Sequence, residues 1–173
     1  RRCLADVSGV TLAGAMTTSG RRISSHAGDV YAPGPCDILA TSRRLAAPGA
    51  ALANGAAAHA LDFDDNCYAG VVHGSATTFP AVLAAAQSEG ASGETMLCGF
   101  IAGSEVQYAV GAALTRAFYD RGWWSTAVLG AVGAAAGAGR VMGLDQAQLA
   151  AAIGLAAAGT GGIRAIRGTE AKH

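Results

Sequence analysis

Apolar residues recur at helical spacing along most of the chain, and short polar or glycine-rich breaks separate these segments. No segment shows a convincing alternation of apolar and polar residues, which would indicate a strand. The pattern therefore predicts an all-α fold, a compact bundle of Ala/Gly-rich helices. The predicted helices cover residues 3–15, 50–65, 76–88, 93–118, 126–142 and 146–158.

The breaks between these helices carry recognisable end signals. Ser92 can cap the predicted helix 93–118, and Asp145 with Gln148 has the spacing of a capping box. Either Ser125 or Thr126 is expected to cap the helix that Gly143 ends. Residues 19–34 are rich in Ser, Gly and Arg and predict a loop, whereas residues 37–45 predict a short helix before Pro48.

Small residues dominate the longest helices. Gly99 and Gly103 lie four apart, as do Gly133 and Gly137, so helices bearing them can approach closely. Glu105 falls in the middle of the predicted helix 93–118, and we expect it to be buried or to hydrogen-bond between helices. Pro80 is expected in the first turn of its helix, where proline is tolerated.

Composition excludes several functional classes. The chain has 12 basic and 12 acidic residues, which gives no electrostatic footprint for nucleic acid. Its four cysteines are scattered without metal-ligand spacing, so free thiols, no metal and a cytoplasmic location are expected. The uncharged stretch 122–139 is mostly Ala and Gly, and it predicts a buried helix rather than a membrane span.

One polar cluster stands out in this apolar chain. Residues 54–80 contain three of the twelve acids within four positions and two of the four histidines. A helix continuing to residue 65 places His59, Asp62 and Asn66 on one face, and directs Asp64 elsewhere. His73 follows in a glycine-interrupted loop. The cluster predicts either an acid/base site or a solvated helix end beside an idle loop histidine.

A second group of charges lies after the glycine-rich segment 160–162. Arg164, Arg167, Lys172 and His173 fall within ten residues of one another. Cations after such a turn suit a ligand with several carboxylates, and a solvated basic tail is the alternative. The spacing of a phosphate-binding loop is absent from this segment.

These motifs, in this order, resemble the MmgE/PrpD family, which includes 2-methylcitrate dehydratases, cis-aconitate decarboxylases and an iminodisuccinate epimerase. The similar segments span nearly the whole chain. They are Asn54-Gly55 with His59, Asp62-Phe63-Asp64-Asp65, His73-Gly74-Ser75, Gly103-Ser104-Glu105-Val106, Arg121-Gly122-Trp123-Trp124-Ser125-Thr126 and Gly168-Thr169-Glu170-Ala171-Lys172-His173. Two positions depart from the pattern, since the family commonly has histidine in place of Trp124 and threonine in place of Asn66.

The resemblance implies a cofactor-independent lyase, most simply a dehydratase, acting on a small di- or tricarboxylate of the 2-methylcitrate type. His73 is expected to be the catalytic acid/base, oriented by Asp62, while Lys172 binds a carboxylate or steadies a carbanion. The expected substrate-binding residues are Asn66, Asp65, Trp124 and Arg167. Decarboxylation or epimerisation by the same groups is an alternative. Uncharged Trp124 is expected to favour a smaller or less charged substrate.

The resemblance also bears on the extent of the domain. Family members are longer and carry a second, smaller α+β domain, so residues 1–173 are expected to form a single helical domain, part of the family's larger one. A homodimer that binds neither nucleic acid nor membrane is implied. A truncated, non-catalytic helical scaffold is the remaining alternative.

Overall fold

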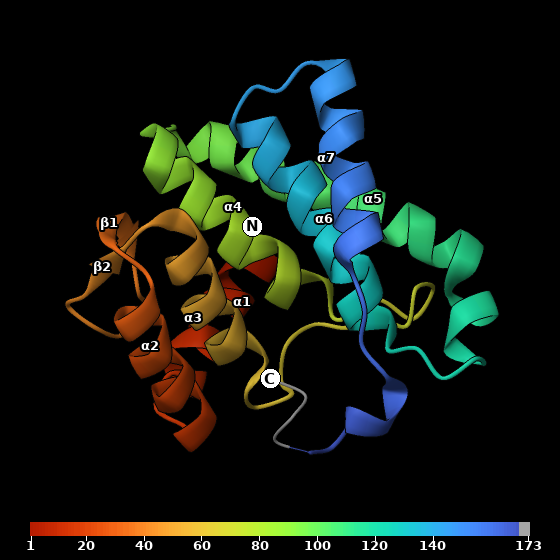
Figure 1. Cartoon of the computed structure of the whole chain (residues 1–173), viewed down its shortest axis with the longest axis horizontal. Helices are drawn as coiled ribbons and strands as arrows, with labels where there is room; N and C mark the ends of the chain where they lie inside the picture. Colours follow the sequence, from red (N-terminus) through yellow and green to blue (C-terminus); the bar gives the residue numbers. More distant parts are fainter. Residues whose placement is uncertain (170–173) are drawn as a thin grey trace.

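Seven α-helices make up most of the structure, a computed structural model that describes residues 1–169 (Figure 1). The all-α prediction is confirmed, with one very small two-stranded sheet added. The elements are α1 (Arg2–Gly14), α2 (Thr18–Val30), β1 (Pro33–Asp37), β2 (Arg44–Leu45), α3 (Ala47–His59), α4 (Gly74–Glu89), α5 (Gly93–Tyr119), α6 (Ser125–Val141), α7 (Gln146–Gly159) and a 3₁₀ turn (Arg164–Ile166).

Helix α4 lies at the centre of the bundle, with α3 on one side and α5 and α6 on the other (Figure 1). It buries most of its residues, and Phe79 and Val82 join Val7 of α1 and Phe100 of α5 in the main hydrophobic core. Helix α2 packs on α3, α1 packs on both α3 and α4, and α7 packs on α6. The N-terminus of the central helix therefore points from the core toward the polar loop that precedes it.

Helices α5 and α6 approach closely through glycines, as the sequence predicts. A Cβ atom on Gly103 would lie 2.6 Å from the carbonyl oxygen of Gly133, and one on Gly99 would lie 2.9 Å from that of Gly137. Only residues without a side chain permit this separation of the two backbones. The close contact holds α6 against α5.

Several predicted elements are wrong. Most of residues 19–34, predicted as a loop, lie in helix α2, which Thr17 caps and which packs along α3. Residues 37–45, predicted as a helix, instead run from the end of β1 to β2 and complete a hairpin. The buried Asn54 side chain holds this hairpin by accepting from the Leu39 N–H and donating to the Asp37 carbonyl, both at 2.9 Å. This long-range contact is absent from any local pattern.

Other expectations fail at single residues. Glu105 is exposed. The buried polar residues of α5 include Gln107, which donates to Thr77 of α4. Pro80 lies beyond the first turn of α4, and Trp124 rather than Ser125 or Thr126 occupies the N-cap of α6. The predicted caps at Ser92 and at Asp145 with Gln148 are confirmed.

Among residues 1–169, α5 is the one helix long and apolar enough to cross a membrane by length and composition. The stretch 122–139, which the sequence predicts to be a buried helix rather than a span, lies mostly in α6 and is not such a candidate. A core helix of a water-soluble protein meets the same two criteria, and α5 packs against both α4 and α6. Its length and composition therefore do not place it in a membrane.

Candidate active site

The polar cluster lies where three segments meet: the end of α3, the loop 60–73, and the start of α4. Helix α3 ends at His59 instead of continuing to residue 65, and Asp62 adopts a left-handed conformation with φ of 57°. Aspartate tolerates this region better than most residues because its short side chain can satisfy nearby backbone groups. The early end overturns the predicted shared face of His59, Asp62 and Asn66.

The loop is fixed to the helices around it by side-chain contacts. The Asp65 carboxylate accepts from the backbone N–H and the hydroxyl of Ser75, at 3.0 and 2.6 Å, in the first turn of α4. Thr115 of α5 donates to the Gly70 carbonyl at 2.7 Å, and Ser125 of α6 donates to the Val71 carbonyl. Val71 itself has φ of 50°, an unusual conformation for a β-branched residue. Three helices thus hold the loop in one shape.

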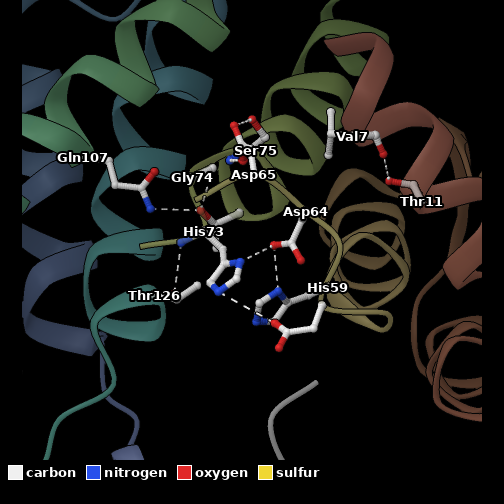
Figure 2. A network of polar contacts seen from close by, with 12 residues as sticks. Val7, Thr11, His59, Asp64, Asp65, His73, Gly74, Ser75, Gln107 and Thr126 are labelled. Atoms are coloured by element: carbon white, nitrogen blue, oxygen red, sulfur yellow. Dashed lines mark hydrogen bonds and ion pairs between the residues drawn. The ribbon is translucent and has the colours of Figure 1, made fainter. Parts of the chain in front are cut away.

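Two histidines flank one buried carboxylate at the centre of the cluster (Figure 2). One oxygen of Asp64 lies 2.8 Å from Nδ1 of His59 and 3.1 Å from Nδ1 of His73. The two imidazole rings meet edge to face, with their centroids 4.8 Å apart. The Asp64 side chain is fully buried, so the prediction that it points away from the cluster is wrong.

Charge at Asp64 determines where the histidine protons lie. Burial raises the pKa of Asp64, but the hydrogen bonds from His59 and His73 outweigh burial, and the pKa lies well below its usual range. The carboxylate is therefore ionised and can only accept hydrogen bonds. Consequently each Nδ1 atom that faces it carries a proton. A neutral His73 then keeps its lone pair on Nε2, on the opposite side of the ring.

That side of the ring faces a polar cavity of about 290 Å³. The cavity brings together five of the residues predicted from the sequence. Asp62 lies at its mouth, 61% exposed, with a carboxylate oxygen 3.7 Å from Nε2 of His73. The lining residues are Asp62, Asn66, Val71, His73, Trp124 and Arg167.

Residues 160–169 complete this cavity by passing under the start of α6. The backbone N–H of Trp124 donates to the Gly162 carbonyl at 2.9 Å, and the N–H of Arg164 donates to the Gly122 carbonyl at 2.7 Å. The Arg164 guanidinium stacks on Tyr119 and donates to its carbonyl, so it faces away from the cavity. Arg167 lines the cavity and is the cation that the described residues supply there.

Two expected site residues lie elsewhere or beyond the described chain. Both carboxylate oxygens of Asp65 bond to Ser75, and Asp65 does not line the cavity. Lys172 lies outside the described residues. Sequence reasoning gave no role to His59 or Asp64. Three aspartates within four positions are unfavourable in a helix. Giving this signal more weight would have ended the predicted helix before Asp62 and left Asp64 able to turn back toward His59.

The same residues are those that could hold a metal ion. Ligand atoms of His59, Asp62, Asp64 and His73 all lie within 4.8 Å of one another. Nδ1 of each histidine, however, faces the ionised Asp64 carboxylate at hydrogen-bonding distance. Unless it displaced these protons, a metal could bind the histidines only through Nε2, with Asp64 as the carboxylate that orients both rings.

Comparisons with known proteins identify the family of the chain. The family model of the MmgE/PrpD N-terminal domain matches residues 1–173. Cis-aconitate decarboxylase-like protein oryM of Aspergillus oryzae is 34% identical over 146 residues, which are 79% of this chain and 30% of that protein. Cis-aconitate decarboxylase of Aspergillus terreus is 28% identical over 130 residues, which are 72% of this chain and 26% of that protein. The chain thus spans less than a third of these relatives, and it belongs to the MmgE/PrpD family.

Proposed function

We propose that the cluster is the acid/base centre of a cofactor-independent lyase that acts on a small polycarboxylate. One observation carries the proposal: the buried, ionised Asp64 fixes the His73 ring so that Nε2 faces the polar cavity. A base in this orientation can remove or deliver a proton at a carbon beside a carboxylate. The resemblance to an enzyme family that includes dehydratases and decarboxylases supports this assignment.

The residues around the cavity have distinct roles in this proposal. Arg167 binds a substrate carboxylate, and Lys172, expected at the same site, steadies the negative charge that develops on carbon. Asn66 offers a neutral hydrogen-bonding group to the substrate. Asp62, near Nε2 of His73, orients a substrate hydroxyl or the imidazolium that forms after proton transfer. Trp124 forms an apolar wall.

Two lyase reactions fit the same groups. In decarboxylation the carbon–carbon bond to a carboxylate breaks, carbon dioxide leaves, and the electron pair stays on the substrate. His73, protonated at Nε2 before this step, donates that proton to carbon. In dehydration His73 removes the α-proton, and the hydroxyl leaves with a proton as water. The names of the two fungal relatives favour decarboxylation of a cis-aconitate-like acid, and dehydration of a 2-methylcitrate-like acid is the second candidate. Epimerisation passes through the same carbanion-like species.

The test is proton NMR in deuterium oxide on the longest natural chain that contains these residues. The substrates are 2-methylcitrate, citrate, cis-aconitate, malate-type acids and iminodisuccinate. Itaconate-like signals from cis-aconitate indicate decarboxylation, and new vinyl signals from a hydroxy acid indicate dehydration. Loss of an α-proton signal without a new carbon skeleton indicates epimerisation. Silence across the whole panel contradicts the proposal and leaves the scaffold alternative.

A matched pair of variants tests the role of His73. His73→Ala is expected to lower turnover by at least about a hundredfold, because the acid/base group is lost. His26→Ala removes an exposed histidine from α2 and is expected to leave turnover unchanged. Full turnover in His73→Ala would remove His73 from the mechanism.

The setting of this activity is proposed from the sequence. We propose a homodimer in the cytoplasm that needs no metal or cofactor. Sedimentation velocity measures the oligomeric state. Dialysis against a chelator measures the metal requirement, and unchanged turnover is expected.

A further inference from the structure

A second, larger cavity adjoins the polar one. Helices α3, α4 and α6 converge around an open groove of about 410 Å³. Of the described residues that line it, none is Asp, Glu, Lys or Arg, and apolar side chains predominate. Its volume lies in the usual range for small-molecule sites. An apolar cavity of about 150 Å³ accepts benzene, so this groove has room for a longer hydrocarbon chain.

Small residues on facing helices keep the groove open. Gly55 of α3 and Ala131 and Ala134 of α6 lie along its walls. A Cβ atom on Gly55 would have the Pro80 ring as its nearest neighbour, at 3.8 Å, so space remains above this glycine. Larger side chains at these lining positions are expected to reduce the volume of the groove.

The groove meets the acid/base site at two residues. Trp124, only 5% exposed, lines both the apolar groove and the polar cavity. His59 lines the groove, while its Nδ1 atom bonds to the Asp64 that also holds His73. Trp124 therefore lies between the groove and the polar cavity.

We propose that the groove is a subsite for an unbranched apolar substituent of the substrate. The substrate is then an alkyl-substituted polycarboxylate, whose carboxylates lie by His73 and Arg167 and whose chain passes Trp124 into the groove. This inference rests on the proposed function. Charge supports it, because the polar cavity supplies a cation for carboxylates while the groove offers none. The apolar face of Trp124 favours a hydrocarbon substituent over a further carboxylate at this position of the substrate.

The test measures how binding depends on chain length. Isothermal titration calorimetry with succinate and with methyl-, butyl- and octylsuccinate needs no turnover, so it works whether or not the reaction is known. The Kd is expected to fall about two- to fourfold for each added methylene until the groove is full. Octan-1-ol, which lacks carboxylates, is expected to bind more weakly than octylsuccinate.

Variants locate the effect in the groove. Ala131→Leu is expected to abolish the dependence on chain length while leaving the Kd for succinate unchanged. Ala134→Leu is the second groove-filling variant if the first does not fold. Ala112→Leu adds the same atoms at an exposed position on α5 and is expected to keep the dependence.

Three results overturn the proposal: a Kd that does not change with chain length, a dependence that survives both groove-filling variants, or octanol binding as tight as octylsuccinate. The first is expected if another segment of a longer chain occupies the groove. Failure of this inference can be told apart from failure of the proposed function. If small acids are turned over but the Kd does not change with chain length, only the groove proposal is rejected. If the Kd falls with chain length but no acid is turned over, only the lyase proposal is rejected.

Discussion

At the scale of single residues, Asp64 holds the candidate site together. Its buried carboxylate contacts both histidines, so replacing it removes the acceptor that fixes their tautomers. Asp64→Asn is expected to give a mixture of Nδ1–H and Nε2–H forms at His73, visible in nitrogen-15 NMR of the imidazole ring. The free energy of unfolding is expected to fall by about 3 kcal/mol, because a buried charged contact is broken.

Asp62→Asn is the matched control. Asp62 is mostly exposed and 3.7 Å from Nε2 of His73, so the same chemical change is expected to cost less than about 1 kcal/mol. It is expected to leave His73 in the Nδ1–H form. Equal losses in both variants would mean that Asp64 has no special role in holding the site.

The lowered pKa of Asp64 also predicts a dependence of stability on pH. Between the usual carboxyl pKa and the lowered one, the unfolded chain binds a proton at this position while the folded chain does not. The Asp64 contribution is therefore complete above about pH 4 and is lost as the pH falls further. Urea unfolding from pH 6 to pH 2 is expected to show the wild type losing this advantage over Asp64→Asn. If the difference in the free energy of unfolding between wild type and Asp64→Asn stayed constant with pH, Asp64 would not be ionised in the folded protein.

Cysteine reactivity gives a test of burial at another residue. Cys36 is fully buried and donates its thiol hydrogen to the Ala84 carbonyl, 3.2 Å away. Burial raises the pKa of this thiol, and the adjacent Asp37 carboxylate adds to the effect. Cys3 and Cys98 are exposed. Iodoacetamide labelling followed by mass spectrometry is expected to modify Cys36 about a hundredfold more slowly than these two, and equally fast in denaturant.

At the scale of elements, the contact between α5 and α6 makes glycine necessary at some positions and dispensable at others. Gly103→Ala places a Cβ atom 2.6 Å from a backbone oxygen, and we expect it to cost about 1–3 kcal/mol. Gly9→Ala in α1 meets no atom within 4 Å and is expected to gain about 0.5–1 kcal/mol. Denaturant unfolding measures both. A neutral Gly103→Ala would show that α6 can move away without loss.

Elements with local signals could be predicted from the sequence. Ser92 and the capping box at Asp145 mark helix starts through contacts within three residues, and the glycines spaced by four predict the close helix pair. Helix α2 could not be predicted, because its polar, glycine-rich sequence is stabilised by packing on α3. The hairpin depends on Asn54, a residue on α3 that follows it in the chain.

The candidate site shows the same division. The sequence motifs brought attention to His73, Asp62 and Trp124, which the fold places around one cavity. The contact between His59 and Asp64 depends on a left-handed turn at Asp62 that no helical pattern shows. The place of Trp124 in the cavity wall depends on the packing of α6 against α4 and α5, which joins segments far apart in the sequence.

At the scale of the whole molecule, packing is uneven, and α7 is its least covered helix. Within residues 1–169, α4 buries most of its side chains and α7 buries none, although α7 is almost entirely apolar. Hydrogen exchange followed by mass spectrometry is expected to show the slowest exchange in α4 and α6 and the fastest helical exchange in α7. The free energy of local opening depends on the buried contacts that opening breaks.

The same Leu→Ala change at a buried and at an exposed position tests this uneven packing. Leu129 of α6 is 1% exposed, and its replacement by alanine is expected to cost about 3 kcal/mol. Leu155 of α7 is 76% exposed, so the same replacement is expected to change the free energy of unfolding by less than about 0.5 kcal/mol. Slow exchange in α7, together with a large loss in Leu155→Ala, would mean that another surface covers this helix in solution. Repeating the exchange at tenfold dilution then decides whether that surface is a second copy of the chain, because only binding between copies weakens with dilution.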